Sequence, residues 1–324
     1  MKFTIGFERE DTKKLYTFWD EIIESHQWTE GRFTKMFEEK WAEYNKMHSV
    51  AFSSWAGAAM ATLEFFNIKG KTVLCPSNTF MATPLSVIKA GGNVEFVDCN
   101  RDDLCISFED LENKIEQFKP AAVWVVHIGG HIAFQIEEIA KLCKKKGVIL
   151  LEDCAHAHGA SWRNKKPGIW GDAGIYSFYS TKTISTGEGR MLVTSNKELE
   201  EYARQYRNYG KPDYKVEGLN YRMSEFAAAI GCVQVDRLDD IVMWKNEYAV
   251  KQLNPRFTNR VRFPEGMQSG YYKYIVFEPI EKSTGKVYES SCHHIMKKMC
   301  DLPNTEWVSQ NHWCVPIYYK GDTA

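Results

Sequence analysis

The stretch GVILLEDCAHAHGA, residues 147–160, combines a short apolar run with a carboxylate that ends it. Residues 147–153 are apolar at nearly every position, which is typical of a strand buried on both faces of a mainly parallel sheet. Similar runs occur at 71–76, 93–98 and 121–127. The pattern therefore predicts a mainly parallel sheet with both faces covered.

The segments between these runs have helical periodicity. Residues 135–146 place apolar side chains at positions i, i+3, i+4 and i+7, and Gly147 follows as a stop signal. Residues 108–118 form a second predicted helix, which Pro120 separates from the next strand. The β-α-β unit thus repeats at least twice, which indicates an α/β fold class.

The length of 324 residues leaves room for about two domains. We expect residues 1–240 to form a large domain that begins with a helical segment. A long helical stretch follows Ser224, and a less regular, proline-containing region follows that stretch. We therefore expect residues 241–324 to form a small second domain.

Composition excludes several classes of protein. The 41 basic and 42 acidic residues give a net charge of −1, which argues against a strongly basic nucleic-acid surface. No apolar run reaches the length of a membrane helix, and the start MKFTIGFERED lacks the features of a secretory signal. We therefore expect a cytoplasmic protein that binds neither nucleic acid nor membrane.

The nine cysteines contain no CxxC pair, as is typical of buried, reduced thiols. Cys292, His293, His294 and Cys300 form one cluster, but their spacing matches no standard zinc motif. We interpret them as part of a helix with two exposed histidines, and we expect no metal site.

Two residues suggest covalent chemistry. Asp153 ends an apolar run, where ligands of an open α/β sheet bind, although a carboxylate that caps a turn or helix is the alternative. Lys182 lies in GDAGIYSFYSTKTISTGEGR (171–190), surrounded by serine and threonine hydroxyls. A lysine with a lowered pKa forms Schiff bases with aldehydes such as pyridoxal phosphate, which also requires an acidic partner and phosphate ligands.

The sequence resembles the DegT/DnrJ/EryC1/StrS sugar aminotransferases, which are pyridoxal-phosphate (PLP) enzymes of the aspartate-aminotransferase fold, fold type I. The resemblance extends from about Trp28 to Tyr248. It depends mainly on EDCAHAHGA (152–160) and SFYSTKTISTGEG (177–189), with support from QWTEGRFTKMFEEKWAEY (27–44), PSNTFMAT (76–83) and GLNYRMSEFAAAIG (218–231). It implies a three-layer α/β/α large domain and a small carboxyl-terminal α+β domain.

The resemblance also implies roles for individual residues around PLP. Lys182 would attach the cofactor covalently, and Asp153 would bind the pyridine nitrogen. Phe80 would lie against the pyridine ring, and its alternative is an ordinary core phenylalanine. Ser177 matches a phosphate-binding serine. His156 replaces a glutamine near the ring hydroxyl, where histidine can also donate a hydrogen bond.

Asn220 matches an asparagine that reaches the cofactor phosphate of the partner subunit, which implies a homodimer with shared active sites.

The sequence departs from the family pattern at three places. Trp55 and Ala56 replace a Gly-Thr pair at the phosphate-binding helix, so Ser53, Ser54 or backbone amides must substitute for the threonine hydroxyl. Arg190 replaces a glycine and contacts an anionic substrate or lies on the surface. The final segment HWCVPIYYKGDTA (312–324) is short, so we expect reduced or reshaped substrate-facing elements.

The implied reaction moves an amino group from glutamate or glutamine to a keto-sugar, which we expect to be nucleotide-linked. Such chemistry serves amino-sugar biosynthesis for a surface polysaccharide, such as lipopolysaccharide, or for a secondary metabolite. One alternative is a sugar dehydratase that uses pyridoxamine phosphate (PMP), but relatives of that kind carry histidine at the position of Lys182. The other is a non-catalytic binding or regulatory protein of the same fold.

Overall fold

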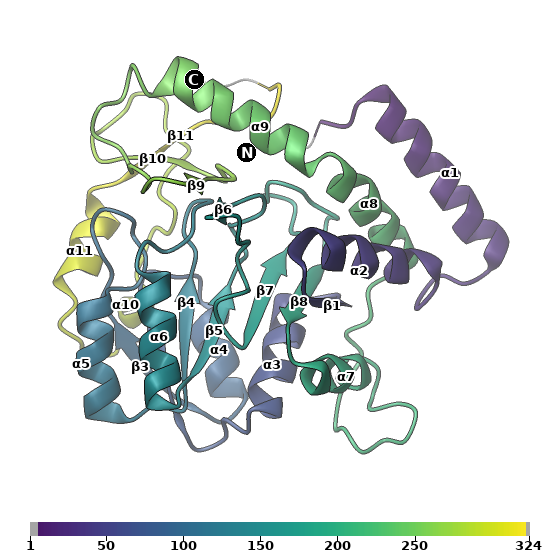
Figure 1. Ribbon diagram of the computed structural model, residues 1–324, viewed down its shortest axis with the longest axis horizontal. Helices are drawn as coiled ribbons and strands as arrows, with labels where there is room; N and C mark the ends of the chain where they lie inside the picture. Colours follow the sequence, from purple (N-terminus) through teal and green to yellow (C-terminus); the bar gives the residue numbers. More distant parts are fainter. Residues whose placement is uncertain (1–5, 322–324) are drawn as a thin grey trace.

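A seven-stranded sheet forms the centre of the computed structural model, which describes residues 6–321 (Figure 1). The parts of MKFTIGFERED and HWCVPIYYKGDTA at residues 1–5 and 322–324 lie outside the described residues. The strand order is β1-β8-β7-β5-β4-β2-β3. Its strands are β1 (His48–Phe52), β2 (Thr72–Pro76), β3 (Asn93–Val97), β4 (Ala122–Val126), β5 (Ile149–Asp153), β7 (Ala173–Ser177) and β8 (Arg190–Thr194).

The sheet is mainly parallel, as the sequence predicted. The strands β3, β2, β4, β5 and β7 pair in parallel, whereas β8 is antiparallel to both β7 and β1. Each of the four apolar runs contains one strand, β2 to β5. Every residue of β4 is buried, which fits a strand covered on both faces.

Helices cover both faces of the sheet, which confirms the three-layer α/β/α architecture. One face packs against α3 (Trp55–Phe65), α4 (Ala82–Lys89) and α7 (Lys197–Tyr206). The other packs against α5 (Phe108–Phe118) and α6 (Ile136–Lys146), and further along against α2 (Arg32–Asn45) and α8 (Glu225–Asp236). The helices α5 and α6 correspond to the two helices predicted from sequence periodicity.

Successive side chains of a strand point to opposite faces of the sheet, and this alternation places Asp153, Ser177 and Arg190 on one face. In β5, Leu151 packs in the core below α3 and α4, so Asp153 lies on that same face. Ser177 follows Ile175 of the same core in the same way, and Ser177 pairs in register with Arg190 of β8. Asp153, Ser177 and Arg190 therefore lie near one another at the carboxyl ends of β5 and β7, on the face of the sheet that α3 and α4 cover.

The helical stretch after Ser224 is interrupted at Arg237, so it forms two helices. These are α8 and α9 (Leu238–Tyr248), and one π-helical turn, η1 (Ala249–Leu253), follows α9. Arg237 is buried and pairs with Asp11 at 3.2 Å, in the amino-terminal helix α1 (Arg9–Ser25). Residue 240 lies within α9, and the domain boundary placed there stays a prediction.

The carboxyl-terminal part contains short elements that pack around α9 and the sheet edge (Figure 1). They are β9 (Met267–Gln268), which pairs with β6 (Ser161–Trp162), the pair β10 (Tyr274–Val276) and β11 (Trp313–Val315), and the helices α10 (Cys292–Ile295) and α11 (Pro303–Gln310). This mixture of small strands and helices agrees with the expected α+β character.

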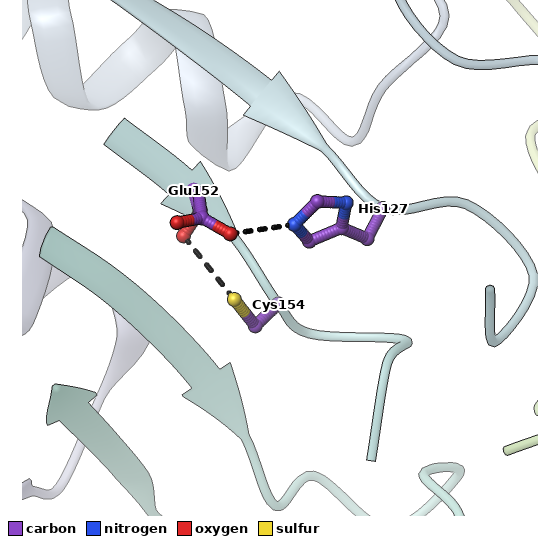
Figure 2. Close-up of side chains that lie close together, drawn as sticks. All are labelled: His127, Glu152 and Cys154. Atoms are coloured by element: carbon purple, nitrogen blue, oxygen red, sulfur yellow. Dashed lines mark hydrogen bonds and ion pairs between the residues drawn. The ribbon is translucent and has the colours of Figure 1, made fainter. Parts of the chain in front are cut away.

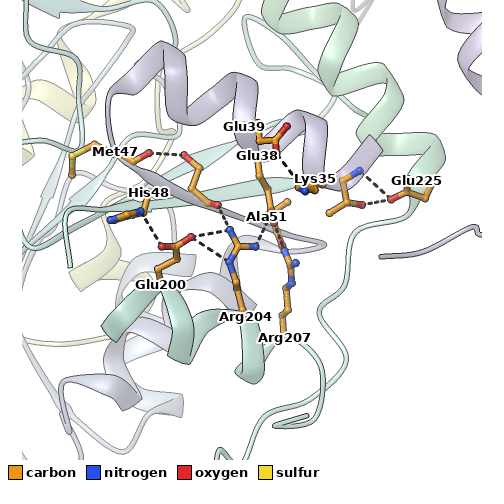
Figure 3. A network of polar contacts seen from close by, with 12 residues as sticks. Lys35, Glu38, Glu39, Met47, His48, Ala51, Glu200, Arg204, Arg207 and Glu225 are labelled. Atoms are coloured by element: carbon orange, nitrogen blue, oxygen red, sulfur yellow. Dashed lines mark hydrogen bonds and ion pairs between the residues drawn. The ribbon is translucent and has the colours of Figure 1, made fainter. Parts of the chain in front are cut away.

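A buried ion-pair network joins α2, β1 and α7 (Figure 3). The Glu38 carboxylate of α2 pairs with Arg207 and, at 2.6 Å, with Arg204. It also accepts the backbone N–H of Ala51 at 2.8 Å, while Arg207 donates to the Ala51 carbonyl at 2.7 Å. Because the buried Glu38 and Arg207 side chains both bond to the backbone of Ala51, the network links β1 to α2 and α7 at the edge of the sheet.

None of the helices in residues 6–321 is long and apolar enough to cross a membrane. All nine cysteines are free thiols, and eight of them are buried. The expectation of reduced, buried cysteines is therefore confirmed.

Candidate active site

A cavity of about 530 Å³ lies beyond the carboxyl ends of β5 and β7. Six predicted site residues line it: Trp55, Phe80, Asp153, His156, Ser177 and Lys182. A larger cavity of about 790 Å³ lies beside the ion-pair network of Figure 3, and its arginines pair with carboxylates of the network. The smaller cavity therefore unites the residues with candidate chemistry, at the edge where open α/β sheets bind ligands.

Asp153 ends β5 and is buried. One carboxylate oxygen accepts the backbone N–H of Ala155 at 3.0 Å, and the other accepts the Thr83 hydroxyl at 3.3 Å. Asp153 thus does cap a turn, as the alternative interpretation held, and it lines the cavity as well. Burial raises its pKa, against the lowering effect of the Lys182 charge. No cationic side chain in residues 6–321 forms an ion pair with it, so the site can accept a positively charged group.

Lys182 lies in the loop between β7 and β8, and its side chain is partly buried. Burial lowers its pKa from 10.5 to about 7, Asp153 opposes that change, and Arg190 and Lys273 add to it. The ammonium lies 4.8 Å from the centre of the Tyr272 ring. A large fraction of this amine is therefore unprotonated and nucleophilic near neutral pH. Lys182 and Asp153 line one cavity and influence each other's pKa, as one bound ring between them requires.

Several hydroxyls around Lys182 serve the loop itself. Ser185 donates to the Phe178 carbonyl at 3.0 Å, and Thr186 donates to the Glu188 carbonyl at 2.7 Å. Gly187, with a φ of 79°, permits the turn that follows. The Ser185 and Thr186 hydroxyls thus stabilise the loop that carries Lys182, while Ser177 and Thr181 line the cavity.

Aromatic rings form the cavity walls. Phe80 is 65% exposed, so the interpretation as a core phenylalanine is wrong. The buried His156 ring lies 4.3 Å from the Tyr272 ring, and its Nδ1 accepts the Gly129 N–H at 3.4 Å. Burial holds the pKa of His156 well below its usual value, and the Lys182 charge lowers it further. His156 is therefore neutral at pH 7, with its proton on Nε2.

Arg190 is 9% exposed, so its interpretation as a surface residue is wrong. It lies between Ser177 of β7 and Phe52 of β1 in the sheet register and lines the cavity. One terminal nitrogen contacts Glu188 at 3.2 Å, whereas Nε has no partner among residues 6–321. The only carboxylate that pairs with the buried Arg190 guanidinium within residues 6–321 is the largely exposed Glu188. The arginine charge is therefore available to bind an anion in the cavity.

The amino-terminal end of α3 contributes Trp55 to the cavity lining. Ser54 caps the helix, since its hydroxyl accepts the Gly57 N–H at 3.1 Å. The Trp55 side chain packs against Trp124 with ring centres 5.3 Å apart and lines the cavity. Ala56 is exposed and does not belong to the cavity lining.

Asn220 lies outside the cavity, in the segment that extends from α7 to α8 (Figure 1). Its side chain is exposed and accepts the backbone N–H of Arg222 at 3.3 Å. Its expected role toward a partner subunit stays a prediction.

His127, Glu152 and Cys154 form a buried cluster beside Asp153 (Figure 2). Glu152 contacts His127 Nε2 at 2.9 Å and accepts the backbone N–H groups of Gly168 and Gly171 at 2.7 and 2.6 Å. His127 Nδ1 in turn accepts the Ala133 N–H at 3.1 Å. Because these groups are already hydrogen-bonded within the protein, we interpret the cluster as a brace for the end of β5 that carries Asp153.

The prediction of two exposed histidines in α10 is wrong for one of them. His293 is 2% exposed, and its Nδ1 lies 2.7 Å from the Ser77 hydroxyl, while His294 is exposed. Glu306 contacts both rings, at 3.3 and 2.9 Å. Cys292 donates its backbone N–H to the Ser77 carbonyl at 2.9 Å. This end of α10 therefore holds the loop that leads to Phe80.

Sequence reasoning missed Tyr272 and Tyr288, which line the cavity from the carboxyl-terminal part of the chain. Tyr272 contacts the Thr181 hydroxyl at 3.1 Å through its own hydroxyl, and Tyr288 stacks with His156 at 5.6 Å. Nothing in the local pattern distinguishes them among 16 tyrosines.

Comparison with known proteins identifies the family. Residues 10–276 match the model of the DegT/DnrJ/EryC1/StrS aminotransferase family. GDP-perosamine synthase of Escherichia coli O157:H7 is 32% identical over 258 residues, 77% of this chain and 70% of the relative. UDP-4-amino-4,6-dideoxy-N-acetyl-beta-L-altrosamine transaminase of Campylobacter jejuni serotype O:23/36 is 34% identical over 230 residues, 68% of this chain and 59% of the relative.

The fold agrees with this assignment. The crystal structure of a DegT DnrJ EryC1 StrS aminotransferase from Brucella abortus superposes with a TM-score of 0.91 at 23% identity, over 99% of this chain and 95% of that one. The chain belongs to the DegT/DnrJ/EryC1/StrS aminotransferase family. It is an aminotransferase that uses PLP, and the expected fold type is confirmed.

The residues present fit PLP. A buried carboxylate without an ion-pair partner faces the same cavity as an amine with a pKa of about 7. Arg190 and Ser177 are register partners that line this cavity together, and they offer the kind of donors that a phosphate needs.

Proposed function

We propose that this enzyme transfers an amino group from glutamate or glutamine to a nucleotide-linked keto-sugar, in amino-sugar biosynthesis. The relatives named as a GDP-perosamine synthase and a UDP-linked amino-sugar transaminase support the substrate class. The observation that carries the proposal is the cavity that unites the Lys182 amine with the buried Asp153 carboxylate.

The cofactor is held from three sides in this proposal. Lys182 would bind it covalently, Asp153 would hold its pyridine nitrogen, and Phe80 would pack against its ring. His156 donates its Nε2 proton toward the ring hydroxyl.

The phosphate is assigned to the other end of the cavity. Ser177 and the Arg190 guanidinium would hold it there, together with the backbone N–H of Trp55 at the start of α3. The buried arginine supplies the charge that compensates for the threonine hydroxyl missing from this helix. Asn220 of a second copy of the chain adds a hydrogen bond, which makes the active unit a homodimer.

Lys182 performs the proton transfers. Bound PLP withdraws electrons from the α-carbon of the attached amino acid, and this acidifies the α-proton. The Lys182 amine would accept that proton and release it again, because its lowered pKa of about 7 leaves about half of it unprotonated at pH 7. Asp153 keeps the pyridine nitrogen protonated throughout. The same residues act in reverse order on the keto-sugar.

The test compares Lys182→Ala with Lys141→Ala, a change on the exposed surface of α6. The purified wild type should show a visible absorption band that borohydride removes, and L-glutamate should change that band. Lys182→Ala should lose the band and all turnover, whereas Lys141→Ala should keep both. Turnover at the wild-type rate by Lys182→Ala would refute the mechanism. A wild type without any band would favour a non-catalytic protein.

A further inference from the structure

A second cavity, of about 340 Å³, adjoins the active-site cavity. The two cavities share a wall that contains Thr181, Lys182 and Tyr272. Lys182, the amine of the proposed reaction, therefore lines both cavities. Whatever occupies the second cavity is next to the point of reaction.

The other wall of the second cavity is positively charged. It contains Lys245, Lys273 and Lys286, whereas Glu289 is the acidic side chain in its lining. The Glu289 carboxylate accepts the backbone N–H of Lys286 at 3.2 Å. No carboxylate in the part of the chain that the structure describes forms an ion pair with any of these three lysines.

None of these three lysines forms an ion pair within residues 6–321, although the Glu289 charge acts on Lys286 and opposes the lowering of its pKa by burial. Lys245 is 6% exposed, and its ammonium donates to the Tyr271 carbonyl at 2.9 Å. Lys273 lies 5.4 Å from the Tyr272 ring centre. Lys286 donates to the Gln310 carbonyl at 2.7 Å and lies 3.8 Å from the Trp313 ring centre. Neutral carbonyls and rings position these ammonium groups but supply no negative charge.

A multiply charged oxyanion matches this arrangement. Buried ammonium groups without a counter-ion are costly, and burial together with Lys273 lowers the pKa of Lys245 to about 7. A bound anion would favour the protonated form and receive charge-assisted hydrogen bonds from several lysines at once. A diphosphate carries this charge over a short span.

The position relative to Lys182 suggests which molecule supplies the diphosphate. We propose that the lysine cavity, defined by Lys245, Lys273 and Lys286, binds the diphosphate of a sugar-nucleotide acceptor while its keto carbon reaches Lys182. This inference rests on the proposed function, since a sugar ring separates the diphosphate from the reacting carbon in such a substrate. The competing occupant is the carboxylate of the amino donor.

The experiment measures binding to the PLP-loaded enzyme by calorimetry. The probes are pyrophosphate, GDP and UDP, with guanosine and uridine as controls that lack phosphate. We expect pyrophosphate and both nucleotides to bind and the nucleosides to bind at least tenfold more weakly. Lys273→Gln and Lys286→Gln should each raise the Kd for GDP and UDP about tenfold, which corresponds to about 1.4 kcal/mol. Lys245→Met, which keeps the side-chain bulk in the buried position, should have a similar effect, whereas Lys141→Gln should have none.

The donor reaction separates the possible failures. If the wild type responds to L-glutamate but binds none of the phosphate probes, the lysine cavity has no diphosphate role and the aminotransferase function stands. If the lysine variants raise the KM for L-glutamate and leave the Kd for GDP and UDP unchanged, the cavity serves the donor and the inference is wrong. If the wild type responds to neither L-glutamate nor L-glutamine, the proposed function itself fails.

Discussion

The lowered pKa of Lys182 predicts how fast the enzyme without cofactor captures PLP at each pH. An amine attacks an aldehyde in its unprotonated form. At pH 7 a lysine with a pKa of 10.5 has about one amine in three thousand unprotonated, whereas a pKa of about 7 leaves about half of them free. Burial of Lys182 therefore accelerates capture at pH 7 by about a thousandfold over an ordinary lysine of equal reactivity.

The assay is stopped-flow absorbance of the cofactor-free enzyme mixed with PLP between pH 5.5 and 9.5. The rate should rise through the region around pH 7 and then become constant, because the amine is fully unprotonated above it. Asp153→Asn should move the midpoint to lower pH, since the Asp153 charge raises the pKa of Lys182. A rate that keeps rising tenfold per pH unit up to pH 9.5 would refute the assignment of a lowered pKa.

Four substitutions test other contacts. Asp153→Asn should retain part of the cofactor but reduce turnover by orders of magnitude in steady-state assays, because an amide does not stabilise a protonated pyridine; equal turnover contradicts that role. Arg190→Gln should weaken PLP binding about tenfold and leave pyridoxal, which lacks the phosphate, unaffected; equal losses for both would exclude a phosphate contact. Phe80→Ala should raise the Kd for PLP about fivefold through lost stacking, with an unchanged Tm because the ring is 65% exposed; a large drop in Tm would show a core role. Glu38→Ala should lower the free energy of unfolding by about 3 kcal/mol in urea titrations, because it leaves the buried Arg207 guanidinium without its ion-pair partner. Lys35→Gln, in an exposed ion pair, should change it by less than about 0.5 kcal/mol.

The central sheet was predictable because each buried strand has a local signature. Apolar runs bounded by turn residues do not depend on distant contacts, so the strands β2 to β5 and the helices α5 and α6 follow from the sequence, whereas α4 between β2 and β3 was not predicted. Asp153 and Lys182 were also predictable, since each follows a strand whose carboxyl end lies at the binding edge.

Residues that enter the site from distant segments were not predictable. Tyr272 and Lys273 precede a three-residue strand, β10, and reach the cavity through the packing of the carboxyl-terminal part. The burial of Arg190 and His293 depends on tertiary neighbours as well, and their side chains are commonly exposed elsewhere. At the break between α8 and α9, Arg237 pairs with Asp11 of α1, which lies more than 220 residues away in the chain, so this contact has no local signature.

The hydrogen bonds between α10 and the loop from Ser77 to Phe80 have a consequence for protein engineering. Cys292 and His293 bond to Ser77 through backbone and side-chain atoms, so the loop that leads to Phe80 is supported by a segment 216 residues away in the chain. A chimera that exchanged the last hundred residues for those of a relative, in order to alter substrate preference, would separate this loop from its support. Such hybrids should therefore carry residues 76–83 and 291–296 together as one transplanted unit.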